Sequence, residues 1–274
     1  MGLHVDLTDR TCLVVGGAGG GIGTAVATTV AEAGASVGVV TNLQAHAEDA
    51  RARLRAGGTP CTATVADVTD ERALVDAIAR VAEELGPIRH LVNVVGGNTA
   101  DDYHPAAEYD MAAFDRVVAR NLRYAVVACR EVARPLLASG TTGSIVNISS
   151  GASRGTPLLG AYAAAKSGLE AFSRTMALEW GPNGIRVNVV SVGSVRTPRT
   201  GTDDNAEGAR TIPLRRRGDT DEVARAVVFL LSDLASYTTG HTLAVDGGIG
   251  LGHPGGTALS ALVTRSDVRS RFPD

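Results

Sequence analysis

A tyrosine and a lysine stand four residues apart in the run YAAAK, at Tyr162 and Lys166. In an α-helix this spacing places both side chains on the same face, one turn apart. Lys166 is also the only lysine of the chain, whose other cationic side chains are arginines and histidines. A composition so biased toward arginine that keeps one lysine indicates that a compact ammonium charge is needed at this position.

This pair could transfer a proton. A phenol with a pKa of about 10 is a poor base at neutral pH. A cation about 4 Å away favours the phenolate by roughly 4 kcal/mol at an effective dielectric constant of about 20. That is roughly three pKa units before desolvation opposes it. The pair therefore predicts that Tyr162 exchanges a proton near pH 7, as a general acid or base.

A glycine-rich run, GGAGGGIG at residues 16–23, follows the apolar segment CLVV and precedes the helical pattern TAVATTVAEAG. Glycine lets bare backbone N–H groups approach a pyrophosphate at a helix N-terminus without a Cβ clash. Glycines alone are weak evidence, but a strand before them and a helix after them favour a phosphate-binding turn. Its candidate cofactor-binding residues are Gly17, Gly19, Gly21, Ile22 and Gly23.

The elements that must position these groups alternate along the whole chain. Short runs rich in β-branched residues predict strands near 12–16, 36–40, 61–66, 90–95, 144–149, 186–192 and 242–245. Helical patterns lie between them, near 22–33, 44–56, 70–85, 112–138, 158–180 and 220–232. Most strands are apolar on both faces, which suits a parallel sheet covered by helices on each side. The expected fold is a single α/β domain with a doubly wound, seven-stranded parallel sheet of the Rossmann-like type.

The spacing GxxxGxG at Gly17, Gly21 and Gly23, together with YxxxK at Tyr162, resembles the classical short-chain dehydrogenase/reductase family. The resemblance covers about residues 6–250, within which residues 194–215 are expected to form a lid, and residues 252–274 are a tail beyond it. It implies an NAD(P)-dependent oxidoreductase, a dehydrogenase or ketoreductase that interconverts a secondary alcohol and a ketone. The alternative is a catalytically inactive cofactor sensor or scaffold of the same fold.

The resemblance also implies a catalytic set of Asn121, a serine, Tyr162 and Lys166. Two serines end the strand run GSIVNISS. The family's commonest spacing to the tyrosine points to Ser149, whereas strand register matches Ser150. Register is fixed by alternating strand faces, while loops tolerate deletions, so Ser150 is the choice here.

Further cofactor contacts follow from the resemblance along the chain. Asp67 and Val68 would lie at the adenine, and Asn93, Val195 and Thr197 on the nicotinamide side. The chain departs from the usual pattern with Gly16 for Thr, Val94 for Asn and Val192 for Pro.

The choice between NAD and NADP is normally read at the end of the second strand, here Thr41 and Asn42. No carboxylate there repels a 2'-phosphate and no arginine attracts one, so both cofactors stay open, with NADP slightly favoured.

The formal net charge of −3 gives no basic footprint for nucleic acid. The histidines lack metal-ligand spacing, and the cysteines are too far apart for a CxxC site or a disulfide framework. The N-terminus lacks a signal-peptide pattern, and glycines and Glu32 interrupt the apolar segment 12–40. We therefore expect a cytoplasmic enzyme without a metal or a membrane span. Its substrate is expected to be a small-molecule alcohol or ketone that is neutral and large or cyclic. The alanine-rich helices 112–138 and 158–180 resemble those that the family packs between subunits, which predicts a homotetramer.

Overall fold

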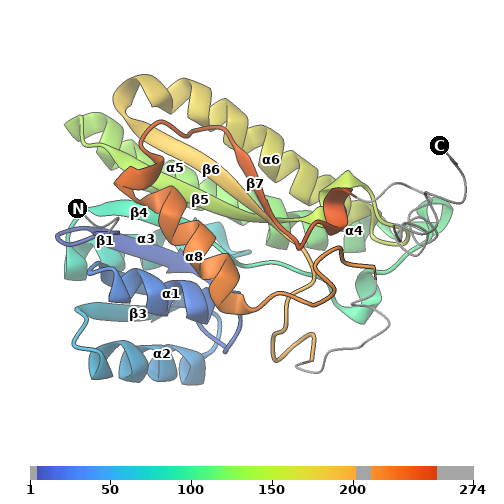
Figure 1. Cartoon of the computed structure of the whole chain (residues 1–274), viewed down its shortest axis with the longest axis horizontal. Helices are drawn as coiled ribbons and strands as arrows, with labels where there is room; N and C mark the ends of the chain where they lie inside the picture. The colour runs from blue at the N-terminus through green and yellow to red at the C-terminus, as the bar shows by residue number, and fades with distance from the viewer. Residues whose placement is uncertain (1–4, 202–210, 252–274) are drawn as a thin grey trace, which may run out of the picture.

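The computed structural model describes residues 5–201 and 211–251, and a seven-stranded sheet runs through their centre (Figure 1). The strands lie in the order β3-β2-β1-β4-β5-β6-β7, and all neighbours are parallel. They are β1 (Thr11–Val15), β2 (Ser36–Thr41), β3 (Cys61–Val65), β4 (Ile88–Asn93), β5 (Gly143–Ser150), β6 (Ile185–Val192) and β7 (Thr242–Val245). The predicted strands and the doubly wound parallel sheet are confirmed.

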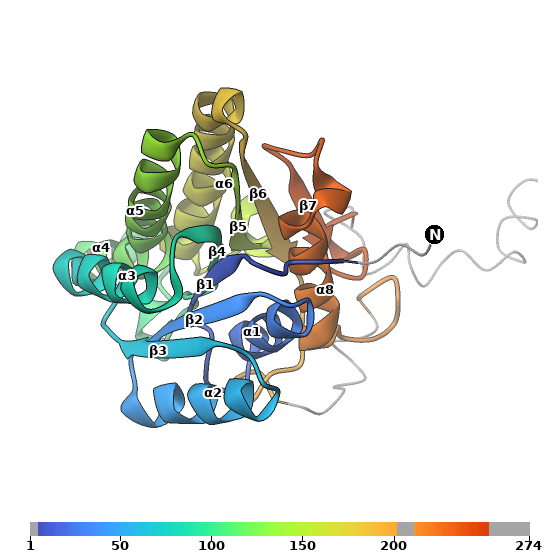
Figure 2. The ribbon, with the colours of Figure 1, turned by 90° about the vertical axis from the view of Figure 1, so that its left-hand side faces the viewer.

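Helices cover both faces of the sheet, as the end-on view shows (Figure 2). One core lies beneath α1 (Ile22–Glu32), α2 (Gln44–Ala56) and α8 (Thr220–Leu231). The other lies beneath α3 (Glu71–Leu85), α5 (Tyr124–Ser139) and α6 (Gly160–Trp180). All five residues of β1 are buried, because helices exclude water from both faces of a central parallel strand.

Local sequence signals set several helix ends. The Asp70 carboxylate accepts hydrogen bonds from the backbone N–H groups of Arg72 and Ala73 and so caps α3. Gly140, in the left-handed conformation with φ 67°, ends α5. The Gly181-Pro182 pair directly follows the last residue of α6.

The prediction of a single helix over 112–138 is wrong in one respect. The structure has α4 (Met111–Val118), a π-helical turn over Ala119–Arg123, and then α5. A π-helical turn adds a residue to the helix, and such turns are frequent at functional sites. This one contains Asn121, whose side chain bonds outside the helix as well as within it.

The chain reverses its direction of winding between β1 and β4. After β3, at the far edge, it returns to place β4 on the other side of β1. In open parallel sheets, ligands bind outside the carboxyl ends of the strands at this switch point. The glycine-rich turn follows β1 and therefore lies there. No helix within the described residues is long and apolar enough to cross a membrane.

Candidate active site

The glycine-rich turn needs glycine for two physical reasons. Gly16 and Gly19 have φ values of +92° and +88°, a region that favours glycine. A Cβ on Gly23 would overlap the carbonyl oxygen of Gly16, so the first turn of α1 packs directly on the backbone. The helix begins after Gly21, and no side chain caps its first N–H groups. Uncapped N–H groups at a helix start can bind a phosphate.

A cavity of about 820 Å³ extends from this turn to the end of β5. Its walls come from the turn, the residues after β4, the end of β5, α6 and the segment after β6. Of the predicted site residues, the cavity is lined by Gly19, Gly21, Ile22, Gly23, Ser150, Tyr162, Lys166, Val195 and Thr197. Ser149, the alternative serine, is also in its wall.

Tyr162 lies in the first turn of α6, beside the end of β5. Burial raises the pKa of its phenol above the ordinary value. A side-chain hydrogen bond with Ser150 and the positive charge of Arg199 act in the opposite direction and lower the pKa. Burial thus outweighs the hydroxyl and the cation, and a further positive charge near the phenol would be needed to bring its pKa toward neutrality.

Lys166 lies one helical turn further along α6 and is only 2% exposed. Its Nζ donates a 2.8 Å hydrogen bond to the carbonyl oxygen of Ile148 and lies 5.8 Å from the centroid of the Tyr162 ring. Burial lowers the pKa of Lys166 to about 8, and the Glu170 carboxylate acts against this shift. The ammonium group is fixed by the strand end and faces the tyrosine ring.

The two serines have different partners. Ser149 is 2% exposed, and its hydroxyl donates a 2.6 Å hydrogen bond to the Glu170 carboxylate. Ser150 is half-buried, accepts a hydrogen bond from the backbone N–H of Ala152 and lowers the pKa of the Tyr162 phenol. Ser149 is thus engaged by Glu170, while Ser150 has no carboxylate partner among the described residues, and the choice of Ser150 stays a prediction.

Asn121 is fully buried, and its side chain forms hydrogen bonds with the backbone that follows β4. Its Oδ1 accepts a 2.7 Å hydrogen bond from the N–H of Gly97, and its Nδ2 donates to the carbonyl oxygens of Gly97 and Val117. A Cβ on Gly96 would lie 2.6 Å from Oδ1 of Asn121 and 3.0 Å from Nζ of Lys166. Asn121 therefore fixes the loop that passes beside the lysine.

The predicted adenosine contacts lie outside this cavity. Thr41 ends β2 with 7% exposure, whereas Asn42, directly after it, is exposed. Asp67 is exposed and accepts hydrogen bonds from the backbone and hydroxyl of Thr69, and Val68 is buried. The structure places them after β2 and β3, at the same sheet edge as the glycine-rich turn.

Gly17 and Asn93 face elsewhere. Gly17 lines a small separate hollow between α1 and α2. Asn93 is fully buried, and its Nδ2 donates a 2.8 Å hydrogen bond to Asn147. The Asn93 side chain thus joins β4 to β5 behind the cavity.

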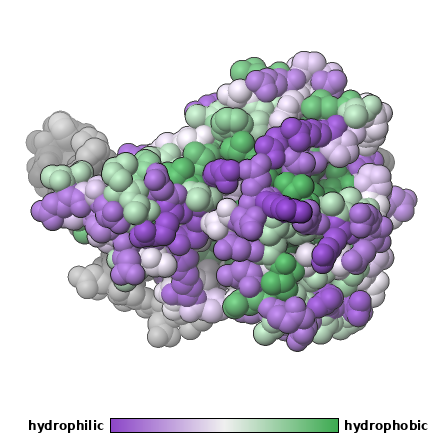
Figure 3. Space-filling view, turned by 180° about the vertical axis from the view of Figure 1, so that it is seen from behind, coloured by the Kyte–Doolittle hydropathy of each residue, from purple (hydrophilic) through white to green (hydrophobic). Residues whose placement is uncertain are grey.

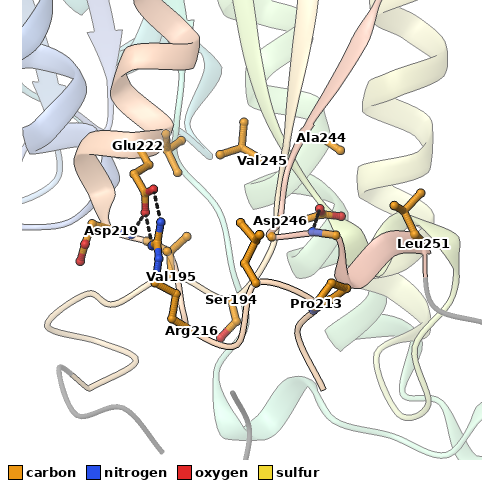
Figure 4. A pocket seen from close by; sticks show the side chains of 15 residues that line it. Ser194, Val195, Pro213, Arg216, Asp219, Glu222, Ala244, Val245, Asp246 and Leu251 are labelled. Carbon is orange, nitrogen blue, oxygen red and sulfur yellow. Dashed lines mark hydrogen bonds and ion pairs between the residues drawn. The ribbon is translucent and has the colours of Figure 1, made fainter. Parts of the chain in front are cut away.

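The predicted lid begins after β6, and its residues 202–210 lie outside the described part of the chain, as does the predicted tail 252–274. A second cavity, of about 500 Å³, shares Ser194 and Val195 with the first. It lies between the lid, the start of α8 and the end of β7 (Figure 4). Across it, Arg216 makes two 2.7 Å hydrogen bonds to the carboxylate of Glu222, which anchors the end of the lid to α8.

Sequence reasoning missed two side chains near the cavity. Arg199 reaches the carbonyl oxygens of Gly96 and Asn98 from the lid. A Cβ on Gly19 would lie 3.3 Å from the His46 ring, which therefore borders the phosphate-binding turn. The available signals were their positions, two residues after Thr197 and four after Asn42.

These residues fit a dinucleotide with a nicotinamide end. The glycine cradle and the uncapped start of α1 suit its pyrophosphate. The cavity continues from there to Tyr162, so the reactive ring would lie beside the phenol. Among the described residues, no group of three or more potential ligands could hold a metal ion.

Comparisons with known proteins agree with this geometry. The family model described as enoyl-(acyl carrier protein) reductase matches residues 17–250. The cis-4-hydroxycyclohexanecarboxylate dehydrogenase of Sinomonas cyclohexanicum is 38% identical over 251 residues, 88% of this chain and 96% of the relative. The galactitol 2-dehydrogenase (L-tagatose-forming) of Cereibacter sphaeroides is 37% identical over 250 residues, covering 88% and 95%.

A solved structure, a blue fluorescent protein from a metagenomic library in complex with NADPH, superposes with a TM-score of 0.81. It is 29% identical, and the match covers 89% of this chain and 99% of that one.

Proposed function

The chain belongs to the short-chain dehydrogenase/reductase family, whose members use a nicotinamide cofactor to interconvert alcohols and carbonyl compounds, and we propose that Tyr162 is the general acid/base of that reaction. The observation that carries the proposal is that Tyr162, Lys166 and Ser150 line one cavity, with Nζ of Lys166 5.8 Å from the centroid of the Tyr162 ring. Ser150 lowers the pKa of its hydroxyl, and Lys166 holds a positive charge beside its ring.

Each residue has a part in proton transfer. When bound, the nicotinamide supplies a hydride acceptor or donor. During oxidation, the substrate carbon loses its hydride and the Oη of Tyr162 takes the hydroxyl proton; during reduction, the same oxygen returns the proton. Ser150 would hold the substrate oxygen by a hydrogen bond, and Lys166 would stabilise the phenolate. Asn121 positions the loop at Gly96 and Gly97, next to the lysine.

The test is Tyr162→Phe, which removes one oxygen atom and leaves the ring in place. We expect turnover to be lost, while NADPH fluorescence titration gives an unchanged dissociation constant. The assay panel contains 4-hydroxycyclohexanecarboxylate, galactitol and cyclohexanol, chosen after the named relatives. Activity within about tenfold of the wild type would remove Tyr162 from the mechanism, and a wild-type protein that binds NADPH without any turnover would favour the inactive sensor.

Within this function we propose NADP as the slightly preferred cofactor and the cytoplasm as the compartment. Support for NADP is the lack of a carboxylate at Thr41 and Asn42, together with the fold shared with an NADPH complex. All three cysteines are free, which suits a reducing compartment.

We also propose a homotetramer. Apolar side chains are exposed on α4 and α6, at Met111 (62%), Phe172 (45%) and Leu178 (80%). Figure 3 shows the face opposite to that of Figure 1, where apolar patches interrupt a hydrophilic surface. Burial of such patches between subunits is favourable. Sedimentation at micromolar concentration tests this proposal, and a monomer alone would contradict it.

A further inference from the structure

The walls of the main cavity carry positive charge and no negative charge. Three cationic side chains line it, namely Lys166, Arg199 and Arg217, and no Asp or Glu is among its described lining residues. A cavity lined by one sign of charge attracts ligands of the opposite sign. The three cationic side chains differ in the hydrogen-bond partners that they have within the protein.

Lys166 and Arg217 both donate hydrogen bonds to other groups of the protein. Lys166 binds the carbonyl oxygen of Ile148 and faces Tyr162. Arg217 is 9% exposed, and its guanidinium donates hydrogen bonds to the carbonyl oxygens of Val195, Thr200 and Gly201. Arg217 therefore holds the first part of the lid, the segment that carries Arg199, against the fold.

Arg199 is exposed, and no carboxylate of the described residues pairs with its charge. Among the described residues it makes no ion pair, and its guanidinium donates only to the carbonyl oxygens of Gly96 and Asn98. A guanidinium has five N–H donors in a planar fork that matches a carboxylate. Two neutral carbonyl partners leave both donors and charge available to a ligand.

Arg199 also lies within electrostatic range of the reacting group. Its charge acts on the phenol of Tyr162, and its guanidinium packs against Gly97, where a Cβ would overlap it. The preceding residue, Pro198, instead approaches the phosphate-binding turn, since a Cβ on Gly20 would lie 3.3 Å from its Cγ. The segment thus presents Pro198 to the cofactor turn and Arg199 to the loop after β4, which lines the same cavity as Tyr162.

We propose that Arg199 binds a carboxylate on the substrate, so that the enzyme acts on a hydroxy acid or oxo acid anion rather than on a neutral alcohol or ketone. This inference rests on the proposed function, because it takes Tyr162 to mark the reacting end of the substrate. It replaces the expectation of a neutral substrate with one of defined charge. The competing source of negative charge is the cofactor pyrophosphate, and the experiment separates the two.

The experiment measures binding, so that it does not depend on turnover. Cyclohexanecarboxylate and cyclohexanecarboxamide have nearly the same shape and differ in charge. Each is titrated by calorimetry into the Tyr162→Phe protein saturated with NADPH, with and without Arg199→Met. Arg80→Met serves as the matched control, because Arg80 is an exposed arginine on α3.

We expect cyclohexanecarboxylate to bind more tightly than cyclohexanecarboxamide. Arg199→Met should raise the dissociation constant of the carboxylate by about ten- to hundredfold, the range for one charge-assisted hydrogen bond. The carboxamide affinity should change by less than about threefold, and Arg80→Met should change neither. An unaltered NADPH dissociation constant confirms that the Arg199→Met protein is folded.

Two results would overturn the proposal. Equal binding of the two probes, or no binding of the carboxylate, shows that the charge is not recognised. A weaker NADPH affinity in Arg199→Met assigns the arginine to the pyrophosphate. Neither result depends on whether Tyr162→Phe abolishes turnover, so failure of the catalytic assignment remains a separate outcome.

Discussion

The hydroxyl of Ser149 donates a 2.6 Å hydrogen bond to the carboxylate of Glu170, whereas Ser150, the next residue, lines the cavity with Tyr162 and lowers the pKa of its phenol. Successive residues of a strand point to opposite faces, so only one of the two hydroxyls can meet the tyrosine. Glu170 accepts the hydrogen bond of Ser149 and also lies one helical turn beyond Lys166 on α6. The same carboxylate therefore engages the unused serine and acts on the charge of the lysine.

The first prediction concerns the two serines. Ser150→Ala should lower kcat by roughly a hundredfold or more, the usual cost of losing one donor to the reacting oxygen. Ser149→Ala removes only the bond to Glu170 and should cost much less. Steady-state kinetics of both variants measure this difference, and the reverse ranking would show that sequence spacing is the better guide to the catalytic serine.

The second prediction concerns the charge of Lys166, which can be observed directly because the chain has no other lysine. Protein labelled with 13C-lysine should give one Cε resonance, and its titration should have a midpoint near pH 8 rather than the ordinary value of 10.5. The sign follows from burial, which disfavours the charged form of a base.

Glu170→Gln is the matched variant for this titration. It removes the carboxylate that raises the pKa of Lys166, so the midpoint should move to lower pH. Asp76→Asn, on the far helix α3, serves as the control and should leave it in place. A wild-type midpoint above about pH 10, close to the free side chain, would show that the ammonium is not desolvated.

The third prediction concerns His90 in β4, a 2% exposed side chain whose ring nitrogens make no hydrogen bond of ordinary geometry to the described residues. Burial lowers its pKa to about 3, nearby arginines act in the same direction, and the backbone at Ser144 opposes them. The folded state keeps His90 neutral, while the unfolded state takes up a proton below about pH 6.5.

The contribution of neutral His90 to the free energy of unfolding is therefore at its maximum above about pH 6.5, and it decreases as the pH falls toward 3. The loss should approach about 1.4 kcal/mol per pH unit. His90→Leu removes this proton linkage, so urea unfolding between pH 7 and 4.5 should show the variant gaining on the wild type as the pH falls. A constant difference across this range would mean that His90 is not excluded from water.

The parallel sheet, its seven strands and most helix limits could be predicted, because alternating apolar runs and helical periods are properties of neighbouring residues. The break at Asn121 could not, since it depends on a bond to Gly97, which lies on another element. Likewise, Tyr162 and Lys166 form a local motif on one helix. Arg199 and His46 acquire their positions only when the lid and α2 fold against the glycine-rich turn.

The last prediction concerns the choice of cofactor, where the structure changes which residues matter. Thr41 is buried, and its carbonyl oxygen accepts a hydrogen bond from Ala66, whereas Asn42 is exposed at the end of β2. A carboxylate in place of Thr41 would be buried and costly, so Asn42 is the better position at which to alter specificity. His46, against Gly19, places a ring nitrogen that can donate a hydrogen bond beside the phosphate-binding turn.

Neither Thr41 nor Asn42 supplies the charge-assisted bond of about 1.5 to 3 kcal/mol that an arginine gives to a 2'-phosphate. Since a tenfold preference corresponds to about 1.4 kcal/mol, we expect NADPH to be favoured over NADH by less than about a hundredfold. Asn42→Arg should widen this preference, and His46→Ala should narrow it by weakening NADPH alone. Asn42→Asp should reverse it, because a carboxylate accepts from the ribose 2'-OH and repels a phosphate.

Fluorescence titration gives the two dissociation constants for each protein, and kcat/KM with either cofactor gives the preference under turnover. Arg80→Met again serves as a control for a change in net charge alone. A wild-type preference for NADH above about a thousandfold, or roughly 4 kcal/mol, would show that residues other than Thr41, Asn42 and His46 bind the ribose and set the cofactor preference. Equal loss of both cofactors in His46→Ala would instead place His46 at the pyrophosphate, which the two cofactors share.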